Sequence, residues 1–154
     1  MSPYLFKLYV RDMLKRVVDS EIGCNIAGCF LNILAYADDM VLLAPSWRGL
    51  QRLLKIVEDA AMAIDMTFNT YKTVCMIFSP TNKCKSVGDS FPQFRLAGNN
   101  LSFVPTFKYL GHIIDNKLLD DTDVQRELRS LFTRTNVLIR RFFALFCECE
   151  IETV

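Results

Sequence analysis

Apolar residues recur with the spacing of an α-helix in three segments of the chain. Apolar pairs repeat every four positions over residues 5–18, with basic side chains beside them, and Pro3 suits the first turn of a helix. The clearest amphipathic stripe covers residues 47–64 and is preceded by Ser46, a helix-capping residue. The last stripe covers residues 124–142, behind a capping box formed by Thr122 and Gln125. The pattern therefore predicts three amphipathic helices.

Two apolar runs of strand length flank a pair of acids between the first two helices. The runs are residues 29–36 and 40–44, and Ala37, Asp38 and Asp39 separate them. Continuous apolar runs of this length are typical of strands that are covered on both faces. The sequence therefore predicts a hairpin with buried strands and two adjacent carboxylates at its tip.

Further strands are predicted after the second helix. The remaining strand-length runs are residues 73–78, 94–97, 101–104 and 107–114. A polar loop is expected over residues 79–93, and Gly98, Asn99 and Asn100 signal a tight turn. The order helix, hairpin, helix, strand, hairpin, strand, helix predicts an α+β fold, with an antiparallel sheet and helices on one face.

The composition predicts a folded intracellular chain and limits the classes of partner that it is expected to bind. Hydrophobic residues make up 51% of the chain and the net charge is +1, which excludes disorder and argues against a dedicated non-specific nucleic-acid binder. The six cysteines form no C-x-x-C pair and His112 is the single histidine, so we expect reduced, mostly buried thiols and no zinc site. No signal peptide or membrane span is expected. The apolar richness suggests a face built for a missing partner segment.

Asp38 and Asp39 are not the Asn-Gly or Asp-Gly pair that a tight turn favours. Adjacent carboxylates repel each other unless a cation lies between them, and Mg²⁺ prefers such hard oxygen ligands. Neighbouring side chains in a strand point to opposite faces, so we expect Asp38 to be the principal ligand. The alternative is a solvated hairpin tip, and the pair alone does not decide between the two.

The surrounding residues resemble the reverse transcriptases of non-LTR (LINE-type) retrotransposons. Residues 34–43, LAYADDMVLL, are similar to the family's catalytic hairpin, motif C. The other matches, in chain order, are the end of motif B (residues 2–6 with Tyr9), the N-x-x-K-T of motif D (residues 68–73) and motif E, the primer grip (residues 107–111). Four motifs in the family's order make a specific match. The resemblance implies a partial polymerase palm over residues 1–116 and the helical start of a thumb over residues 117–154.

The resemblance implies RNA-directed DNA synthesis by two-metal nucleotidyl transfer, with Mg²⁺ or Mn²⁺, an RNA template, a DNA primer and deoxynucleoside triphosphates. Asp38 and Asp39 would hold metal, and Tyr36, two residues before Asp38, would floor the nucleotide site. Lys72 would act near the pyrophosphate, or be a solvated lysine. Asn69 belongs to the same motif and is expected at the nucleotide site.

Motif E and the last helix supply the expected primer contacts. Lys108 and Tyr109 would lie near the primer terminus, although Tyr109 fits a core position equally well. Gly111 is expected to meet a backbone requirement in a strand. The arginines expected to follow a nucleic-acid backbone, or merely to be solvated, are Arg126, Arg129 and Arg134. His112 is interpreted as structural.

The sequence departs from the family pattern in two ways. The family's third metal carboxylate and its fingers precede motif B, where this chain starts, so the isolated chain is expected to show little or no polymerase activity. Asp65 stands where the family commonly has Gly, at a helix end where left-handed backbone is expected. The alternative function is a non-catalytic retroelement remnant that binds nucleic acid or a protein partner. A nuclease or structural domain with a coincidental acid pair is a third alternative, which four ordered motifs disfavour.

Overall fold

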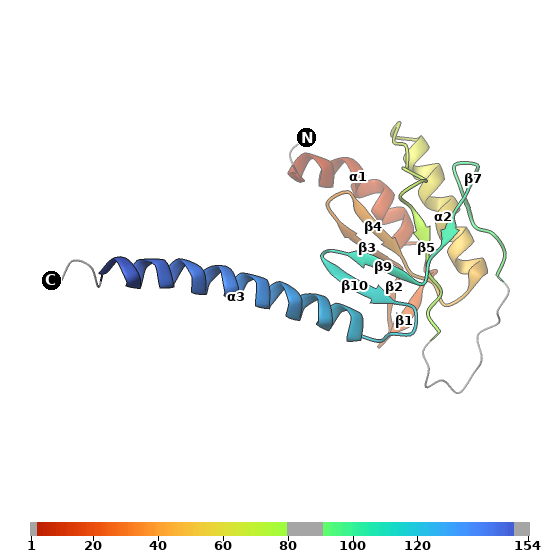
Figure 1. The fold of residues 1–154 in the computed structure, drawn as a ribbon. Helices are drawn as coiled ribbons and strands as arrows, with labels where there is room; N and C mark the ends of the chain where they lie inside the picture. The colour runs from red at the N-terminus through yellow and green to blue at the C-terminus, as the bar shows by residue number, and fades with distance from the viewer. Residues whose placement is uncertain (1–2, 80–90, 150–154) are drawn as a thin grey trace. The chain divides into compact units, whose positions relative to one another are not determined.

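In a computed structural model the chain is described over residues 3–79 and 91–149, and it divides into two compact units. The first unit comprises residues 1–75 and 87–103, and the second comprises residues 76–86 and 104–154. The elements of the first unit are α1 (Pro3–Val18), β1 (Cys24–Ile26), β2 (Cys29–Leu31), β3 (Ile33–Tyr36), β4 (Asp39–Leu42), α2 (Trp47–Met62), β5 (Val74–Cys75), β6 (Arg95–Leu96), β7 (Asn99–Asn100) and β8 (Ser102–Phe103) (Figure 1). Those of the second are β9 (Thr106–Tyr109), β10 (His112–Asp115) and α3 (Asp121–Cys149).

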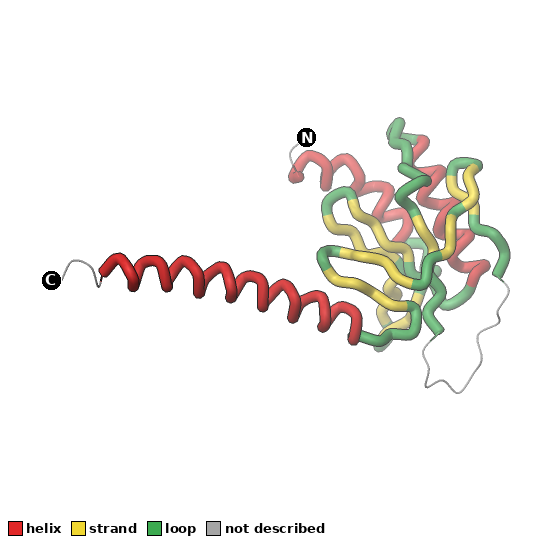
Figure 2. The backbone as a smooth tube through the Cα atoms, viewed as in Figure 1, coloured by secondary structure: helices red, strands yellow, loops and turns green. Residues whose placement is uncertain are grey.

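The described strands form five two-stranded pairs (Figure 2). Four pairs are antiparallel hairpins, whereas β5 pairs in parallel with β8. The α+β class predicted from the element order is confirmed, but the strands are distributed over small pairs instead of one sheet. Residues 80–90 of the predicted polar loop lie outside the described residues.

The main core of the first unit lies between α1 and α2. Val10, Met13 and Val17 of α1 are buried against the apolar face of α2, and Leu53 is fully buried. Burying each such side chain contributes about 1.5–3 kcal/mol to folding. Ser46 begins α2 as predicted, because its hydroxyl oxygen accepts a hydrogen bond from the Gly49 N–H at 3.2 Å. The two helical stripes predicted from the sequence are therefore confirmed, and together they form the platform for the strands.

A buried polar residue interrupts the apolar run that was predicted to be one strand over residues 29–36. Asn32 separates β2 from β3 and is 2% exposed. Its side-chain amide donates to the Val17 carbonyl at 2.6 Å, and its own carbonyl accepts from the Leu43 N–H at 2.9 Å. Because a buried amide must find partners, this residue ties the end of α1 to the strands and divides the run in two.

A second, smaller core forms on the other apolar positions of α2. Leu54 packs with Cys75, Phe94, Leu96 and Leu101. Burial raises the pKa of the Cys75 thiol to about 11. Cys24 is half-buried and Cys29 is exposed, so the expectation of mostly buried thiols is wrong for these two.

The predicted hairpin around residues 98–100 has a different register. Its two-residue turn is Ala97-Gly98, and β7 consists of Asn99 and Asn100, which were expected in the turn. The next residues, Ser102 and Phe103, leave the hairpin and pair with β5. The apolar run 101–104 therefore serves a different strand pair from the one that its spacing indicates.

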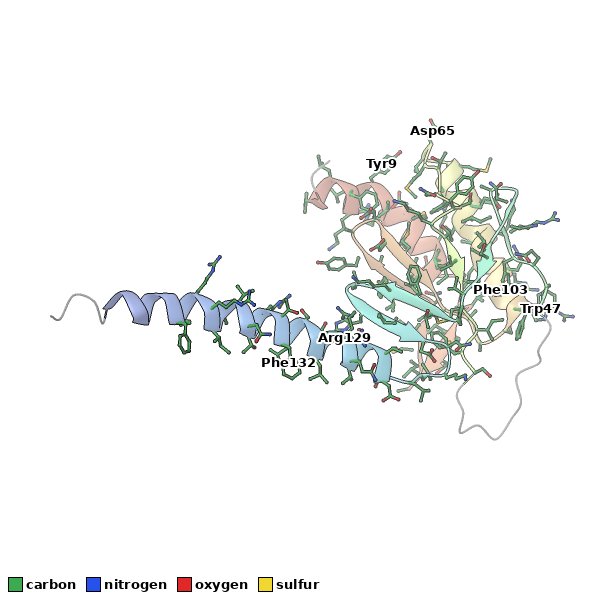
Figure 3. The ribbon with its side chains drawn as sticks, viewed as in Figure 1. Tyr9, Trp47, Asp65, Phe103, Arg129 and Phe132 are labelled. Atoms are coloured by element: carbon green, nitrogen blue, oxygen red, sulfur yellow. The ribbon has the colours of Figure 1, made fainter. Side chains whose placement is uncertain are left out.

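The end of α2 has the left-handed residue that the sequence indicates. Asp65 has φ +52°, its N–H bonds to the Met62 carbonyl at 3.3 Å, and the Met66 N–H bonds to the Ala61 carbonyl at 2.9 Å. These two bonds are the Schellman pattern of helix termination. The Tyr9 hydroxyl of α1 donates to the Ile64 carbonyl in the same turn, and Figure 3 shows Tyr9 beside the segment that carries Asp65. The turn thus ties α1 to the end of α2.

The second unit begins with a hairpin where the sequence predicted a single strand. The apolar run 107–114, expected to be one strand, is the hairpin β9–β10, which turns at Leu110 and Gly111. The last helix also begins earlier than the capping box predicts: the Val124 N–H donates to the Asp120 carbonyl at 2.9 Å, so Asp120 precedes the first helical residue. Asp120 and Asp121 therefore replace Thr122 at the start of α3.

We predict that Asp65→Gly raises the free energy of unfolding by roughly 0.5 kcal/mol. Relief of the left-handed conformation, worth ~1 kcal/mol, exceeds the added unfolded-state entropy of glycine. Ala63→Gly is the matched control, because Ala63 has φ −66° in the same turn and should lose about 1 kcal/mol. Urea unfolding measures both. Equal destabilisation by the two substitutions would contradict the account of this turn.

Candidate functional site

The register of the β3–β4 hairpin determines which side chains share a face. Ile33 pairs with Leu42, and Tyr36 pairs with Asp39. Ile33, Met40 and Leu42 pack against the α1–α2 core. Because strand side chains alternate, Tyr36 and Asp39 lie together on the opposite face.

The outer face of this hairpin is open in the first unit. Tyr36 is 65% exposed and Leu34 is 41% exposed. The prediction that both strands are buried is therefore wrong, because only the face that carries Met40 and Leu42 contacts the core. An apolar outer face above two acids is a surface suited to contact with another molecule or segment.

The turn at the tip differs from the other three hairpin turns. Those are alanine- or leucine-glycine pairs in which both φ angles are positive, Ala27-Gly28, Ala97-Gly98 and Leu110-Gly111. Here the pair is Ala37-Asp38, and only Ala37 has a positive φ, +52°. A glycine at the first position would relieve the conformation of Ala37, whereas the second position has no positive φ and therefore neither requires a glycine nor excludes an aspartate.

Asp38 lies in this turn, whereas Asp39 is the first residue of β4. Tyr36 and Asp38, although two residues apart, therefore do not share a strand face, and it is Asp39 that pairs with Tyr36. Alternation likewise does not separate the two carboxylates, because one of them is outside the strand. Both acids are exposed, and neither forms an ion pair among the described residues.

The tip offers part of the ligand set that a divalent ion needs. In the described part of the chain no group of three or more histidine, cysteine or acidic side chains gathers at one point. Mg²⁺ is commonly bound through one or two carboxylates, with water and substrate phosphates completing its ligands. Asp38 and Asp39 fit that mode of binding, but they do not form a complete protein cage.

The segment that carries Asn69 and Lys72 is a turn organised by Asn69. The Asn69 side-chain oxygen accepts from the Lys72 N–H at 3.2 Å, and its carbonyl accepts from the Thr73 N–H and hydroxyl at 3.1 and 2.8 Å. Phe68 anchors the turn, since it packs against both cores. Asn69 therefore forms the turn through its own side chain. Only a nucleotide contact was expected for Asn69 from the sequence, although asparagine is a recognisable turn signal.

Lys72 is exposed at the end of this turn. No hydrogen bond or ion pair joins it to Asp38 or Asp39 within the residues that the structure describes. The first unit therefore carries the predicted residues Tyr36, Asp38, Asp39, Asn69 and Lys72, and of these the register brings only Tyr36 and Asp39 into a direct pair.

The predicted primer-grip residues lie on β9–β10 in the second unit. Lys108 is exposed, Tyr109 is half-buried and pairs with His112 across the strands, and Gly111 has φ +92°. Gly111 thus meets a backbone requirement, as expected, but in a turn instead of a strand. The half-buried ring of Tyr109 leaves both of its predicted roles open.

Asp123 joins β10 to the first turn of α3. Its carboxylate accepts from the Ile113 N–H at 2.9 Å, lies 3.0 Å from His112 Nδ1, and accepts from Arg126 Nε and Nη2 at 3.0 and 2.9 Å. The Ile113 amide, followed by His112 and Arg126, holds the pKa of Asp123 far below its usual range. Sequence reasoning did not identify this acid, because its partner Ile113 is ten residues away.

These contacts distinguish Arg126 from the other two arginines that were predicted to bind phosphate. The Arg126 guanidinium is bound to Asp123 and to Glu127. Arg129 and Arg134 are exposed and form no ion pair in the described part of α3. Figure 3 shows Arg129 projecting from the helix. Arg129 and Arg134 are therefore available to a phosphate backbone, whereas Arg126 is engaged in anchoring the helix.

The first unit is an α+β structure in which the β3–β4 hairpin packs against α1 and α2 and presents two adjacent carboxylates at its tip. A model of the reverse transcriptase (RNA-dependent DNA polymerase) family matches residues 1–114. Over 114 residues the chain is 36% identical to the Retrovirus-related Pol polyprotein from type-2 retrotransposable element R2DM of Drosophila melanogaster. The chain belongs to the reverse transcriptase family, as a domain of a non-LTR retrotransposon, and the resemblance drawn from its four motifs is confirmed.

The match covers 72% of this chain and 11% of the Drosophila relative, so the chain spans a small part of that protein's length. Reverse transcriptases act on an RNA template and a DNA primer with deoxynucleoside triphosphates, and they use divalent metal ions. None of the described helices has an apolar stretch that is long enough to cross a membrane.

We predict that Asp123→Asn lowers the melting temperature near neutral pH and that this difference becomes smaller in acid. A depressed carboxyl pKa contributes stability that is present above its unfolded value of about 4 and is lost as pH falls through the folded value. The difference from wild type should therefore be constant above about pH 5 and shrink towards pH 2. Asp121→Asn, an exposed acid of the same helical turn, is the control. A difference that persists unchanged in acid would contradict the assigned contacts.

Proposed function

We propose that Asp38 and Asp39 are the metal-binding carboxylates of an RNA-directed DNA polymerase, and that this chain is its catalytic palm segment. The observation that carries the proposal is the tip itself: two adjacent carboxylates are exposed, form no ion pair among the described residues, and stand on a hairpin that packs against two helices. The family match over residues 1–114 supports the same reading. Mg²⁺ or Mn²⁺ is the proposed ion.

Divalent ions bound there would stabilise charge on the attacking 3′-oxygen and on the leaving pyrophosphate. Tyr36, paired with Asp39 and 65% exposed, offers its ring as a floor for the nucleotide. The exposed Lys72 provides a cation for the pyrophosphate. Asn69 shapes the turn that presents Lys72, and through it contributes to nucleotide binding.

The second unit supplies the proposed primer and backbone contacts. Lys108 and Tyr109 are proposed to meet the primer terminus, with Gly111 allowing the tight turn that presents them. Arg129 and Arg134 are proposed to contact phosphates. We divide the chain into a palm segment, residues 1–116, and the start of a thumb, residues 117–154.

The apolar side chains of α3 favour a partner for this helix. Leu131 and Phe132 are 60% and 66% exposed, and Phe142 and Phe143 are 56% and 67% exposed. Apolar side chains at helical spacing normally face a core. We infer that α3 packs against another polypeptide segment, and that the isolated chain has little polymerase activity. The alternative function is that of a non-catalytic retroelement remnant, which binds a protein partner or nucleic acid.

The metal assignment is tested by Mn²⁺ titration monitored by nuclear magnetic resonance. Paramagnetic broadening should affect the amides of residues 36–40 first and should be abolished by Asp38→Asn with Asp39→Asn. Asp120→Asn with Asp121→Asn is a matched control, since it removes another adjacent acid pair at an exposed position. Broadening that survives loss of Asp38 and Asp39, or that centres on Asp120, would exclude the proposed site.

For α3, we predict that Leu131→Gln with Phe132→Gln reduces self-association and the binding of a hydrophobic dye at least twofold, because it removes two large exposed apolar groups. Arg129→Gln with Arg134→Gln is the control, with the same number of changes on the same helix. Sedimentation velocity gives the association state. Unchanged association in the apolar variant would contradict a docking role for this face.

A further inference from the structure

A basic and aromatic surface lies on the exposed side of α2. Trp47, Arg48, Gln51, Arg52 and Lys55 line a shallow, open depression of about 400 Å³. We refer to these five residues as the α2 basic face. Trp47, the single tryptophan of the chain, is 43% exposed, and the three cationic side chains are exposed as well. Figure 3 shows Trp47 at the beginning of α2, away from the β3–β4 hairpin.

Two of the three cations on this face, Arg48 and Arg52, are not balanced by acids among the described residues. Residues 45–57 contain three cations and no acid. Lys55 is paired with Asp59 at 2.9 Å and with Glu58 at 3.6 Å, but Arg48 and Arg52 form no ion pair among the described residues. The first turn of α2 has no acidic residue, and a cation there opposes the helix dipole. The helix dipole therefore does not explain Arg48, which lies in that first turn.

Aromatic and cationic groups are combined at one end of the face. The Arg48 guanidinium carbon lies 5.3 Å from the Trp47 ring centroid, a cation–π distance. The Gln51 side-chain amide donates to the Arg95 carbonyl at 3.4 Å, which places β6 beside the face. The Arg95 side chain is exposed and donates to Asn100 through Nε. Arg95 thus extends the cationic surface beyond the helix.

The α2 basic face is separate from the acidic tip. Leu53, Val57, Ala60 and Ala61 of α2 are buried in the core on which the β3–β4 hairpin packs. Arg48, Arg52 and Lys55 are on the opposite, exposed side of the same helix. A ligand on this face would therefore be separated from Asp38 and Asp39 by the core of the first unit.

We propose that the α2 basic face binds single-stranded nucleic acid. Arg48 and Arg52 would contact successive phosphates, and Trp47 would stack with an unpaired base, the combination that single-strand binding surfaces use. The positive charge favours a polyanion as ligand. The exposed indole favours a single strand, whose bases are free to stack, in preference to a duplex. This surface does not depend on polymerase activity at Asp38 and Asp39.

Trp47 provides a direct readout, because its fluorescence is the only tryptophan signal of the chain. We expect single-stranded uridine oligonucleotides of about 12 nucleotides to quench it in a saturable and salt-dependent manner. Arg48→Gln with Arg52→Gln should reduce the slope of log affinity against log salt concentration by about 1.4, two phosphate contacts at ~0.7 each. Lys7→Gln with Arg11→Gln, equal in charge and spacing and also exposed, should leave the slope unchanged.

Labelled oligonucleotide anisotropy on Trp47→Leu gives an independent measurement, with a loss of about fivefold or more in affinity expected from lost stacking. Binding is measured without divalent ions, so a failure of the proposed metal site would not alter this result. Equal losses in the two double variants would overturn the proposal, because they would reflect net charge alone. Stronger quenching by duplex RNA, by phosphatidylserine vesicles or by an acidic peptide would also overturn it.

Discussion

The acidic tip of this domain depends on the packing of one face of a hairpin against two helices. Ile33, Met40 and Leu42 project into the core that α1 and α2 form, and this contact leaves the other face of the hairpin open. Reversing the faces would place Tyr36 and Asp39 in an apolar interior, where an unpaired carboxylate is strongly disfavoured. The same packing therefore provides stability and determines where the acids are presented.

Asn32 and Asp65 extend this constraint along the chain. The amide of Asn32 connects the Val17 carbonyl at the end of α1 to the beginning of β3, and the left-handed turn at Asp65 returns the chain from α2. Phe68 then packs on both cores and positions the turn of Asn69 and Lys72. Together these contacts place the β3–β4 hairpin and the turn of Asn69 and Lys72 around the cores of the first unit.

The helical stripes, the Ser46 cap, the Asp65 turn and the family were predictable from sequence, because each depends on spacing or on a local motif. The strand boundaries and pairings were predicted wrongly where they depend on contacts that the local sequence does not show. Nothing in the run 29–36 shows that Asn32 finds Val17, and nothing in the run 107–114 marks a turn except Gly111. The pairing of β8 with β5 joins residues far apart in the chain. Arg126 was expected to follow a nucleic-acid backbone or to be solvated, and its pair with Asp123, three residues earlier, was missed although it is local.

The most direct test of whether this segment carries a competent catalytic hairpin is to supply the remainder of a polymerase. Residues 1–114 of this chain would replace the matching segment of the Drosophila relative, and primer extension on an RNA template would be measured. The account predicts extension that requires a divalent ion and is lost, by at least about a thousandfold, in the Asp38→Ala chimera. A folded chimera that binds primer and template without extending, or one that extends equally well with Asp38→Ala, would contradict it.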